Sequence, residues 1–178
     1  METMRVKTSR ASALLGSMMA AALALGGCEG GANFIERDQL YRSHATWTTV
    51  KGNDGRSYRY TDRDSSFTGF SWETTIEVHG ATVVSRAYTR KDMAGAVAET
   101  WTEDASALGS HAAGAPPLTI DEIYDRCAST VLAKDPAANL ITLTFHDDGV
   151  LDTCTYFPKN CADDCAVGYR ISSYQLLN

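Results

Sequence analysis

Five cysteines constrain this chain more than any other residue type, because one follows an apolar leader and four lie in the last third. The stretch DTCTYFPKNCADDCAVGY, from Asp152 to Tyr169, contains three of them, and Cys127 precedes it. Cysteines grouped in this way can bind a metal, act as reactive thiols or form disulfides. The compartment of the protein decides among these chemistries, so the amino terminus is interpreted first.

The amino terminus has the layout of an export signal. Arg5, Lys7 and Arg10 precede an uncharged run over residues 11–25, and a basic segment before an apolar one is typical of secretory signals. The apolar run is shorter than the about 20 residues that span a bilayer, and the glycines after it break helices. The sequence therefore predicts export rather than a membrane-spanning helix. Met4 is an alternative start to Met1.

The quartet LGGC, from Leu25 to Cys28, resembles the lipobox of bacterial lipoproteins, whose cysteine receives diacylglycerol and acyl chains such as palmitate. We therefore expect a lipoprotein signal peptide over residues 1–27, lipid attachment at Cys28 and a short tether over residues 28–33. The alternative is an ordinary signal peptide cut near Gly27, which would leave Cys28 as a free thiol.

The four remaining cysteines are an even number in an exported chain, which favours disulfides over zinc or catalysis. The spacing C-x6-C-x3-C lacks the C-x2-C pairs of tetrahedral metal sites, and no histidine lies nearby in sequence. We favour a Cys127–Cys154 pair and a Cys161–Cys165 pair. A Cys154–Cys161 pair remains the alternative.

The charge of the chain argues against nucleic acid as a partner. The net charge is −6. It becomes −8 without the leader, because three positive charges and one negative charge are removed with residues 1–27. Phosphate backbones are bound through Lys and Arg side chains, and no basic stripe occurs in the sequence.

An amphipathic helix is expected at the start of the exported chain. Residues 34–50 place Leu40, His44 and Trp47 at helical spacing, with charged residues on the other side. We interpret His44 as a helix-face residue rather than a metal ligand.

A second helix is expected over residues 119–134. Thr119 and Glu122 form a T-x-x-E capping box, and Pro136 follows the end. The residues at i, i+3, i+4 spacing that form its buried face are Ile120, Ile123, Tyr124, Cys127 and Val131.

Alternating apolar residues predict β-strands in the rest of the chain. A first hairpin turns at His79-Gly80, with Trp72, Thr74, Ile76 and Val78 facing one way and Val83, Ser85 and Ala87 returning. A second hairpin turns at His146–Gly149, and a closing strand alternates Val167, Tyr169 and Ile171. The pattern predicts a single α+β domain over residues 34–178, with one antiparallel β-sheet packed by one main helix and a short N-terminal helix.

The segment from Lys91 to Leu118 is rich in alanine, glycine and small polar residues and shows no clear periodicity. Structureless loops of this length are uncommon unless they carry a function, so a lid or partner-binding element is one interpretation. The favoured interpretation is a surface loop with Trp101 against the sheet.

Acidic residues supply the remaining candidates for chemistry. His146 stands beside Asp147 and Asp148, which would suit acid–base work, although an acidic turn closed by Gly149 is the favoured interpretation. A cation could bind Asp147 and Asp148 together with Asp163 and Asp164, but these residues lack the spacing of a calcium loop. No nucleophile, zinc or phosphate-loop motif occurs, so we expect no catalytic residues, metal or cofactor.

The order of these features resembles an uncharacterised bacterial domain-of-unknown-function family of small secreted lipoproteins. The resemblance spans most of the chain after the leader. It is carried by the helix sequence TIDEIYD and by the acidic pair Asp163-Asp164 before the last strand. The family implies a secreted lipoprotein and no established activity.

A membrane-anchored binding or inhibitory module for a protein or envelope component is the function that these features favour. The alternatives are a hydrolase-type enzyme and a cation-binding lipoprotein that uses its acidic loops. Because Glu29 rather than aspartate follows Cys28, resemblance to other lipoproteins favours the outer over the inner membrane.

Overall fold

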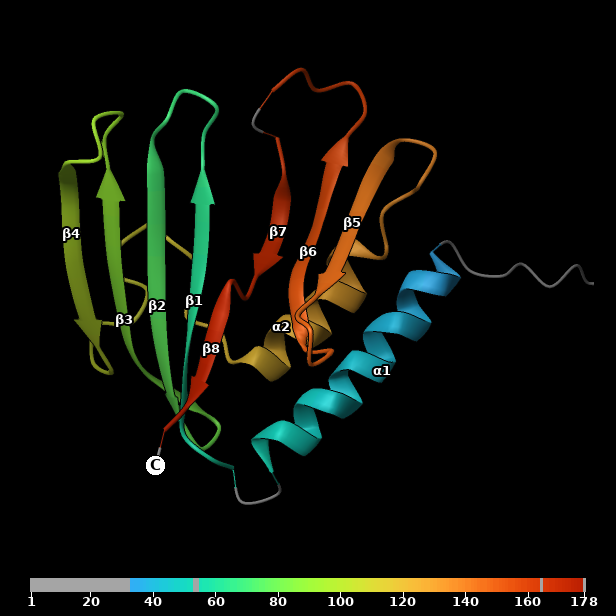
Figure 1. Ribbon diagram of the computed structural model, residues 1–178, viewed down its shortest axis with the longest axis horizontal. Helices are drawn as coiled ribbons and strands as arrows, with labels where there is room; N and C mark the ends of the chain where they lie inside the picture. Colours follow the sequence, from blue (N-terminus) through green and yellow to red (C-terminus); the bar gives the residue numbers. More distant parts are fainter. Residues whose placement is uncertain (1–32, 53–54, 164, 178) are drawn as a thin grey trace, which may run out of the picture.

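The computed structural model describes residues 33–52, 55–163 and 165–177, and Figure 1 shows the order of its elements. The helices are α1 (Phe34–Lys51) and α2 (Ile120–Arg126), and α2 is continued by a π-helical turn, η1 (Cys127–Val131). The strands are β1 (Tyr58–Ser65), β2 (Ser71–His79), β3 (Thr82–Lys91), β4 (Val97–Asp104), β5 (Asn139–Phe145), β6 (Leu151–Pro158), β7 (Val167–Arg170) and β8 (Ser173–Leu176). The expected mixture of helices with a mostly antiparallel β-structure is confirmed.

The strands of the described part form two antiparallel sheets, not the single sheet that the sequence predicts. One has the order β4-β3-β2-β1-β8 and the other the order β5-β6-β7. The closing strand explains the difference, since it divides between them. Ile171 N still donates to Asp152 O of β6 (2.6 Å), whereas Ser172 N donates to Thr61 O of β1 (2.8 Å). This crossing joins the sheets edge to edge, as Figure 1 shows.

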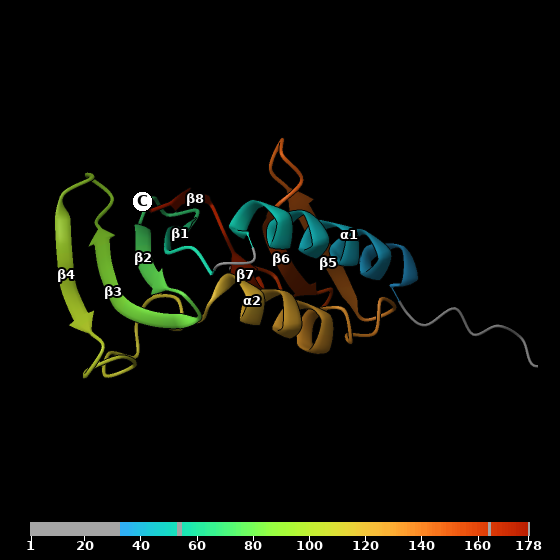
Figure 2. The ribbon, with the colours of Figure 1, turned by 90° about the horizontal axis from the view of Figure 1, so that it is seen from below.

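Helix α1 is the longer helix, which corrects the expectation of a short N-terminal helix beside one main helix. It has 18 residues, and its threonines do not interrupt it because their hydroxyls donate to carbonyls one turn back. Thr48 Oγ1, for example, donates to His44 O at 2.9 Å. Lys51 Nζ then binds Asp121 Oδ1 on α2 (2.7 Å). The two helices lie side by side next to the three-stranded sheet (Figures 1 and 2).

The start of α2 confirms the predicted capping box. Glu122 N donates to Thr119 Oγ1 (3.1 Å), and Thr119 N donates to Glu122 Oε2 (2.7 Å). The helix widens after Arg126, where Leu132 N donates to Cys127 O (2.9 Å), five residues back. The predicted helix is therefore an α-helix for its first half and a π-turn for its second.

One hydrophobic core lies between the helices and both sheets. Trp47 of α1 packs edge-on against Tyr58 of β1 and Tyr174 of β8. Residues from all parts of the fold complete it; they include Leu40, Tyr60, Ile76, Val78, Ile120, Ile123, Tyr124, Val131, Leu132, Leu151 and Ile171. The two hydroxyls at its centre are satisfied, because Tyr60 donates to Leu118 O (2.7 Å) and Ile120 N donates to Tyr58 (3.0 Å).

Candidate functional site

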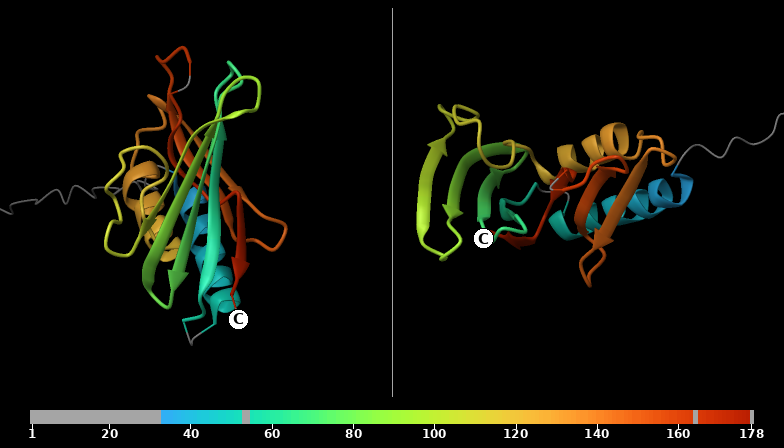
Figure 3. Two further views of the ribbon diagram at one scale, coloured as in Figure 1. Left: turned by 90° about the vertical axis from the view of Figure 1, so that its left-hand side faces the viewer. Right: turned by 90° about the horizontal axis from the view of Figure 1, so that it is seen from above.

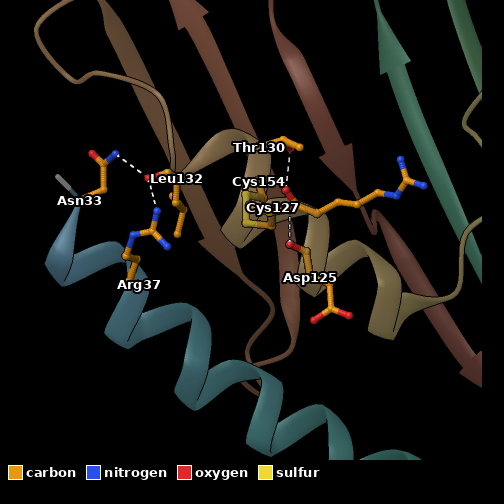
Figure 4. Close-up of a disulfide and its surroundings, with 9 residues drawn as sticks. Asn33, Arg37, Asp125, Cys127, Thr130, Leu132 and Cys154 are labelled. Atoms are coloured by element: carbon orange, nitrogen blue, oxygen red, sulfur yellow. Dashed lines mark hydrogen bonds between the residues drawn. A yellow bond between two sulfur atoms is a disulfide. The ribbon is translucent and has the colours of Figure 1, made fainter. Parts of the chain in front are cut away.

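The four cysteines pair as the sequence favours. Cys127 of η1 and Cys154 of β6 form a disulfide with Cα atoms 6.0 Å apart, and both residues are fully buried (Figure 4). Cys161 and Cys165 form a second disulfide in the loop between β6 and β7, with Cα atoms 6.3 Å apart. The first disulfide therefore ties the helical turn η1 to the three-stranded sheet, and the second closes the loop between β6 and β7. Cys28, the predicted leader and residues 29–32 of the predicted tether lie outside the described residues.

Residues His146–Gly149 form a β-turn, which is the favoured interpretation rather than the acid–base alternative. Gly149 N donates to His146 O (2.8 Å), and Gly149 adopts the positive φ of 86° that the turn requires. His146 Nε2 donates to Ile171 O (2.6 Å). Asp148 accepts hydrogen bonds from Val150 N and from the Tyr174 hydroxyl. All these polar groups therefore stabilise the turn between β5 and β6.

The same contacts favour the ionised form of the Asp148 side chain. Burial acts to raise the pKa of Asp148, but the hydrogen bonds from Tyr174 and Val150 outweigh it and hold that pKa below its ordinary value. The acidic residues weighed as an alternative cation site are Asp147, Asp148, Asp163 and Asp164. Within residues 33–52, 55–163 and 165–177 no three acidic, histidine or cysteine side chains are grouped as metal ligands. Asp164 lies outside the described residues.

The segment from Lys91 to Leu118 is not one long loop, since residues 97–104 form β4 at the edge of the larger sheet. Arg86, Tyr88 and Arg90 of β3 face Glu103, Trp101 and Glu99 of β4 in register. Only residues 105–119 remain as a connection, and they cover part of the sheet on the side where α2 lies. We call this side of the five-stranded sheet the inner face.

A bulge in β3 brings Arg86 to the inner face. Val83 pairs with Val78 and Ser85 with Glu77, so Val84 is an extra residue. The extra residue exchanges the two faces of the sheet for every β3 side chain that follows it. Arg86 and Tyr88 therefore point inward beside Ile76 and Thr74, and the predicted alternation of Val83 with Ser85 and Ala87 is broken at the bulge.

Glu103 is the centre of a buried polar cluster on the inner face. Its side chain is 0 % exposed and that of Arg86 is 3 % exposed. Arg86 donates from Nε to Glu103 Oε2 (2.8 Å) and from Nη2 to Glu103 Oε1 (2.7 Å). Two backbone amides of the connection, those of Gly109 and His111, also donate to the Glu103 carboxylate, at 2.8 and 2.7 Å. Glu103 thus fastens residues 105–119 to the sheet.

The charge of Glu103 is strongly favoured in the folded protein. The Arg86 guanidinium holds the pKa of Glu103 well below its ordinary value against the opposing effect of burial, and the donors from His111 and Gly109 lower it further. Arg86 also donates to His111 O (2.7 Å) and Ala115 O (3.0 Å). Both members of the pair therefore hold the connection.

Stacked rings lie next to this ion pair. The Trp101 ring lies between those of Tyr88 and His111, with centroid distances of 5.1 and 4.3 Å. The Arg86 guanidinium lies 4.7 Å from the Trp101 centroid, which is a favourable cation–π distance. Gly114 is required where the connection passes over them, because a Cβ atom there would lie 2.8 Å from Thr74 Oγ1. Trp101 therefore packs against the sheet, which confirms the interpretation favoured from the sequence.

A cleft opens where β1 and β2 meet the end of the three-stranded sheet, beyond the part that residues 105–119 cover. Its volume is about 280 Å³, and its walls include Asp64, Trp72, Phe157, Cys165 and Arg170. Arg170 Nη1 lies 2.9 Å from Asp64 Oδ2 at its side. We call this the junction cleft, because β1 and β2 come from one sheet and Phe157 and Arg170 from the other. It offers aromatic surface together with a charged pair.

Asp62 lies one pleat from Asp64 on β1 and is only partly exposed. Burial raises the pKa of Asp62 to about 6, and the charge of Asp64 adds to the increase, while Arg170 opposes it. Asp62 also lines a small space under Pro116 and Leu118, beside Tyr60 and Tyr169. A partly buried carboxyl with a raised pKa is therefore next to the junction cleft, and none of the sequence motifs pointed to it.

A second, shallower groove lies between the two helices. Leu40, Tyr41, His44 and Tyr124 line it, with a volume of about 230 Å³. His44 stacks on Tyr124 with a centroid distance of 4.6 Å, and its Nε2 is 3.6 Å from Asp121 Oδ1. His44 is thus a helix-face residue, as its spacing indicates.

Comparison with protein-family models, with curated proteins and with solved structures finds no match to this chain. The resemblance to a lipoprotein family therefore stays a prediction. Among the residues that the structure describes, no helix combines the length and the apolar character needed to cross a bilayer.

Proposed function

We propose that this chain is a membrane-anchored envelope lipoprotein that works as a binding or inhibitory module, with the junction cleft as its binding site. The observation that carries the proposal is the composition of that cleft. Trp72 and Phe157 offer ring surfaces, and the Asp64–Arg170 pair offers both acceptors and donors. Aromatic and arginine side chains in pockets contribute most of the binding energy at protein interfaces.

The surroundings of the junction cleft support a preformed site. The Cys161–Cys165 disulfide constrains the loop that supplies one wall. β1 and β2 are paired along their whole lengths, from Tyr58↔Val78 to Ser65↔Ser71. A site built on paired strands and a cross-linked loop loses little conformational entropy when a partner binds.

The membrane anchor is tested first. We expect the intact mass of detergent-extracted protein to correspond to an acylated chain that begins at Cys28. Cys28→Ser should release the protein into the soluble fraction, because the thiol that receives the lipid is lost. An unmodified, soluble wild-type chain would contradict the anchor.

Trp72→Ala tests the binding site. We expect this variant to capture about tenfold less partner than wild type from detergent-solubilised envelope, because losing a central aromatic anchor costs about 1.4 kcal/mol or more. The measurement is quantitative mass spectrometry of proteins and envelope components retained by the full-length, lipidated chain. Melting curves should show that both proteins are folded at the assay temperature.

Tyr41→Ala is the matched control. Tyr41 is an aromatic residue that is 75 % exposed on α1 and lines the groove between the helices. It should capture as much partner as wild type. If Tyr41→Ala loses the partner and Trp72→Ala retains it, the helix groove is the binding site and the junction cleft is not.

A further inference from the structure

We infer that the amino-terminal end of α1 lies on the lipid surface, with Phe34 and Ile35 in contact with the bilayer. This inference rests on the proposed anchor at Cys28. It assigns a membrane-facing side to the fold, which the anchor alone does not, because lipid attachment at Cys28 does not by itself determine which side of the fold meets the lipid.

The point where the chain leaves the fold is held firmly. Asn33 has a φ of 62° and does not cap α1; its Nδ2 instead donates to Leu132 O (3.2 Å) and Lys134 O (3.1 Å). Arg37 Nη2 donates to the same Leu132 O at 2.8 Å (Figure 4). These donors satisfy carbonyls at the end of η1, where helices leave acceptors unpaired. The first turn of α1 is therefore fixed to the helix that the Cys127–Cys154 disulfide ties to β6.

The tether is too short to move this end away from the membrane. Five peptide units separate Cys28 from Asn33, which span at most roughly 18 Å when fully extended. If acyl chains hold Cys28 at the bilayer surface, the six peptide units from Cys28 to Phe34 keep Phe34 within roughly 20 Å of that surface.

The residues at this end are apolar and exposed. Phe34 and Ile35 are each 68 % exposed in the described structure, although they are consecutive in a helix that buries other apolar side chains. Glu36 and Asp38 follow them, so the end has no excess of positive charge to attract anionic lipid. Apolar contact with the interface, rather than charge, is what this surface fits.

Two other exposed apolar residues serve as an internal comparison. Phe67 and Met93 are 76 % and 68 % exposed, but they lie in the β1–β2 and β3–β4 turns, far from the start of α1 in Figures 1 and 3. They match Phe34 and Ile35 in character and differ in their distance from the tether.

The experiment places an environment-sensitive fluorophore on a single new cysteine in the full-length, acylated protein. Ile35→Cys and Phe67→Cys are compared; only the new thiol should react, because the other cysteines are acylated or in disulfides. The proteins are reconstituted into phosphatidylcholine vesicles, whose neutral headgroups exclude charge attraction, with or without lipids that carry a nitroxide quencher. We expect the label at Ile35 to shift to shorter wavelength and lose most of its emission to the quencher, and the label at Phe67 to stay unchanged.

A label at Tyr41→Cys, about 10 Å further along the same helix, should be quenched less than the label at Ile35. Water-like emission at both Ile35 and Phe67, with acyl mass present, would overturn the inference and leave the anchor intact. Equal quenching at Phe67 would overturn it as well, because the contact would not be at the α1 end. Absence of acyl mass would instead remove the proposed anchor.

Discussion

Replacing Cys127 and Cys154 together by alanine should lower the free energy of unfolding by about 3 to 4 kcal/mol, as estimated from loop-closure entropy. The two residues are separated by 27 positions and are both fully buried, so the variant loses a cross-link and leaves two small gaps in the core. The disulfide connects η1 to the central strand of the smaller sheet. Denaturant unfolding of the oxidised protein, measured by circular dichroism, gives the difference.

The Cys161→Ala, Cys165→Ala double variant is the control for this prediction. Its cross-link closes only four positions and lies in a partly exposed loop, so its removal should cost less. Non-reducing peptide mapping should recover both pairs and no free thiol. A Cys154–Cys161 link, or equal losses of stability in the two double variants, would contradict the assignment of the core cross-link.

Glu103→Gln should destabilise the protein by about 3 to 5 kcal/mol, because it leaves the Arg86 guanidinium buried without its counter-charge. The substitution also replaces one of the two side-chain oxygens by an NH2 group, although both oxygens accept hydrogen bonds from Arg86, Gly109 or His111. Amide hydrogen exchange should become faster in residues 105–119 than in the helices. Thermal unfolding and hydrogen exchange by mass spectrometry measure the two effects.

The pH dependence of this effect follows from the lowered pKa of Glu103. A carboxyl whose pKa is lower in the folded state contributes stability above its unfolded pKa, which is about 4.3 for glutamate. This contribution is lost as the pH falls from there towards the folded pKa. The stability difference between wild type and Glu103→Gln should therefore be full at neutral pH and shrink steadily below about pH 4.3.

A double replacement separates the ion pair from the space it fills. Arg86→Met with Glu103→Leu should be less destabilising than Glu103→Gln alone, because no buried charge is left without a partner. Tight contact between the connection and the sheet should still be lost, since leucine has no acceptor for the amides of Gly109 and His111. If Glu103→Gln is as stable as wild type at neutral pH, Glu103 does not hold the connection.

Short-range signals were sufficient for much of this protein. The capping box at Thr119 was readable because its partners are three residues apart, and the buried face of α2 followed from helical spacing. The cysteine pairing followed from that face, because it directs Cys127 towards the strand that carries Cys154. The turn at Gly149 was equally local.

The candidate site was less accessible to sequence reasoning. Arg86, Tyr88 and Arg90 on β3 match Glu99, Trp101 and Glu103 on β4 in charge and aromatic character, and this complementary alternation was a signal that could have revealed β4. Apolar alternation does not reveal the strand, because two of its three inward positions are the charged residues Glu99 and Glu103. The junction cleft had no such signal, since its walls come from β1, β2, β6 and the closing segment.

The sequence by itself predicted both helices, most of the strand-forming segments, the two hairpins and the favoured cysteine pairs, because each depends on spacing within a few turns of chain. Only the tertiary structure decided that residues 97–104 form β4 and how the hairpins combine into sheets. The bulge at Val84 turns Arg86 inward, and the crossing after Ile171 divides the strands between two sheets. Both depend on the energy of pairing segments far apart in the chain. A single extra residue reverses every side chain beyond it, so the face of the sheet that forms the candidate site cannot be derived from alternation alone.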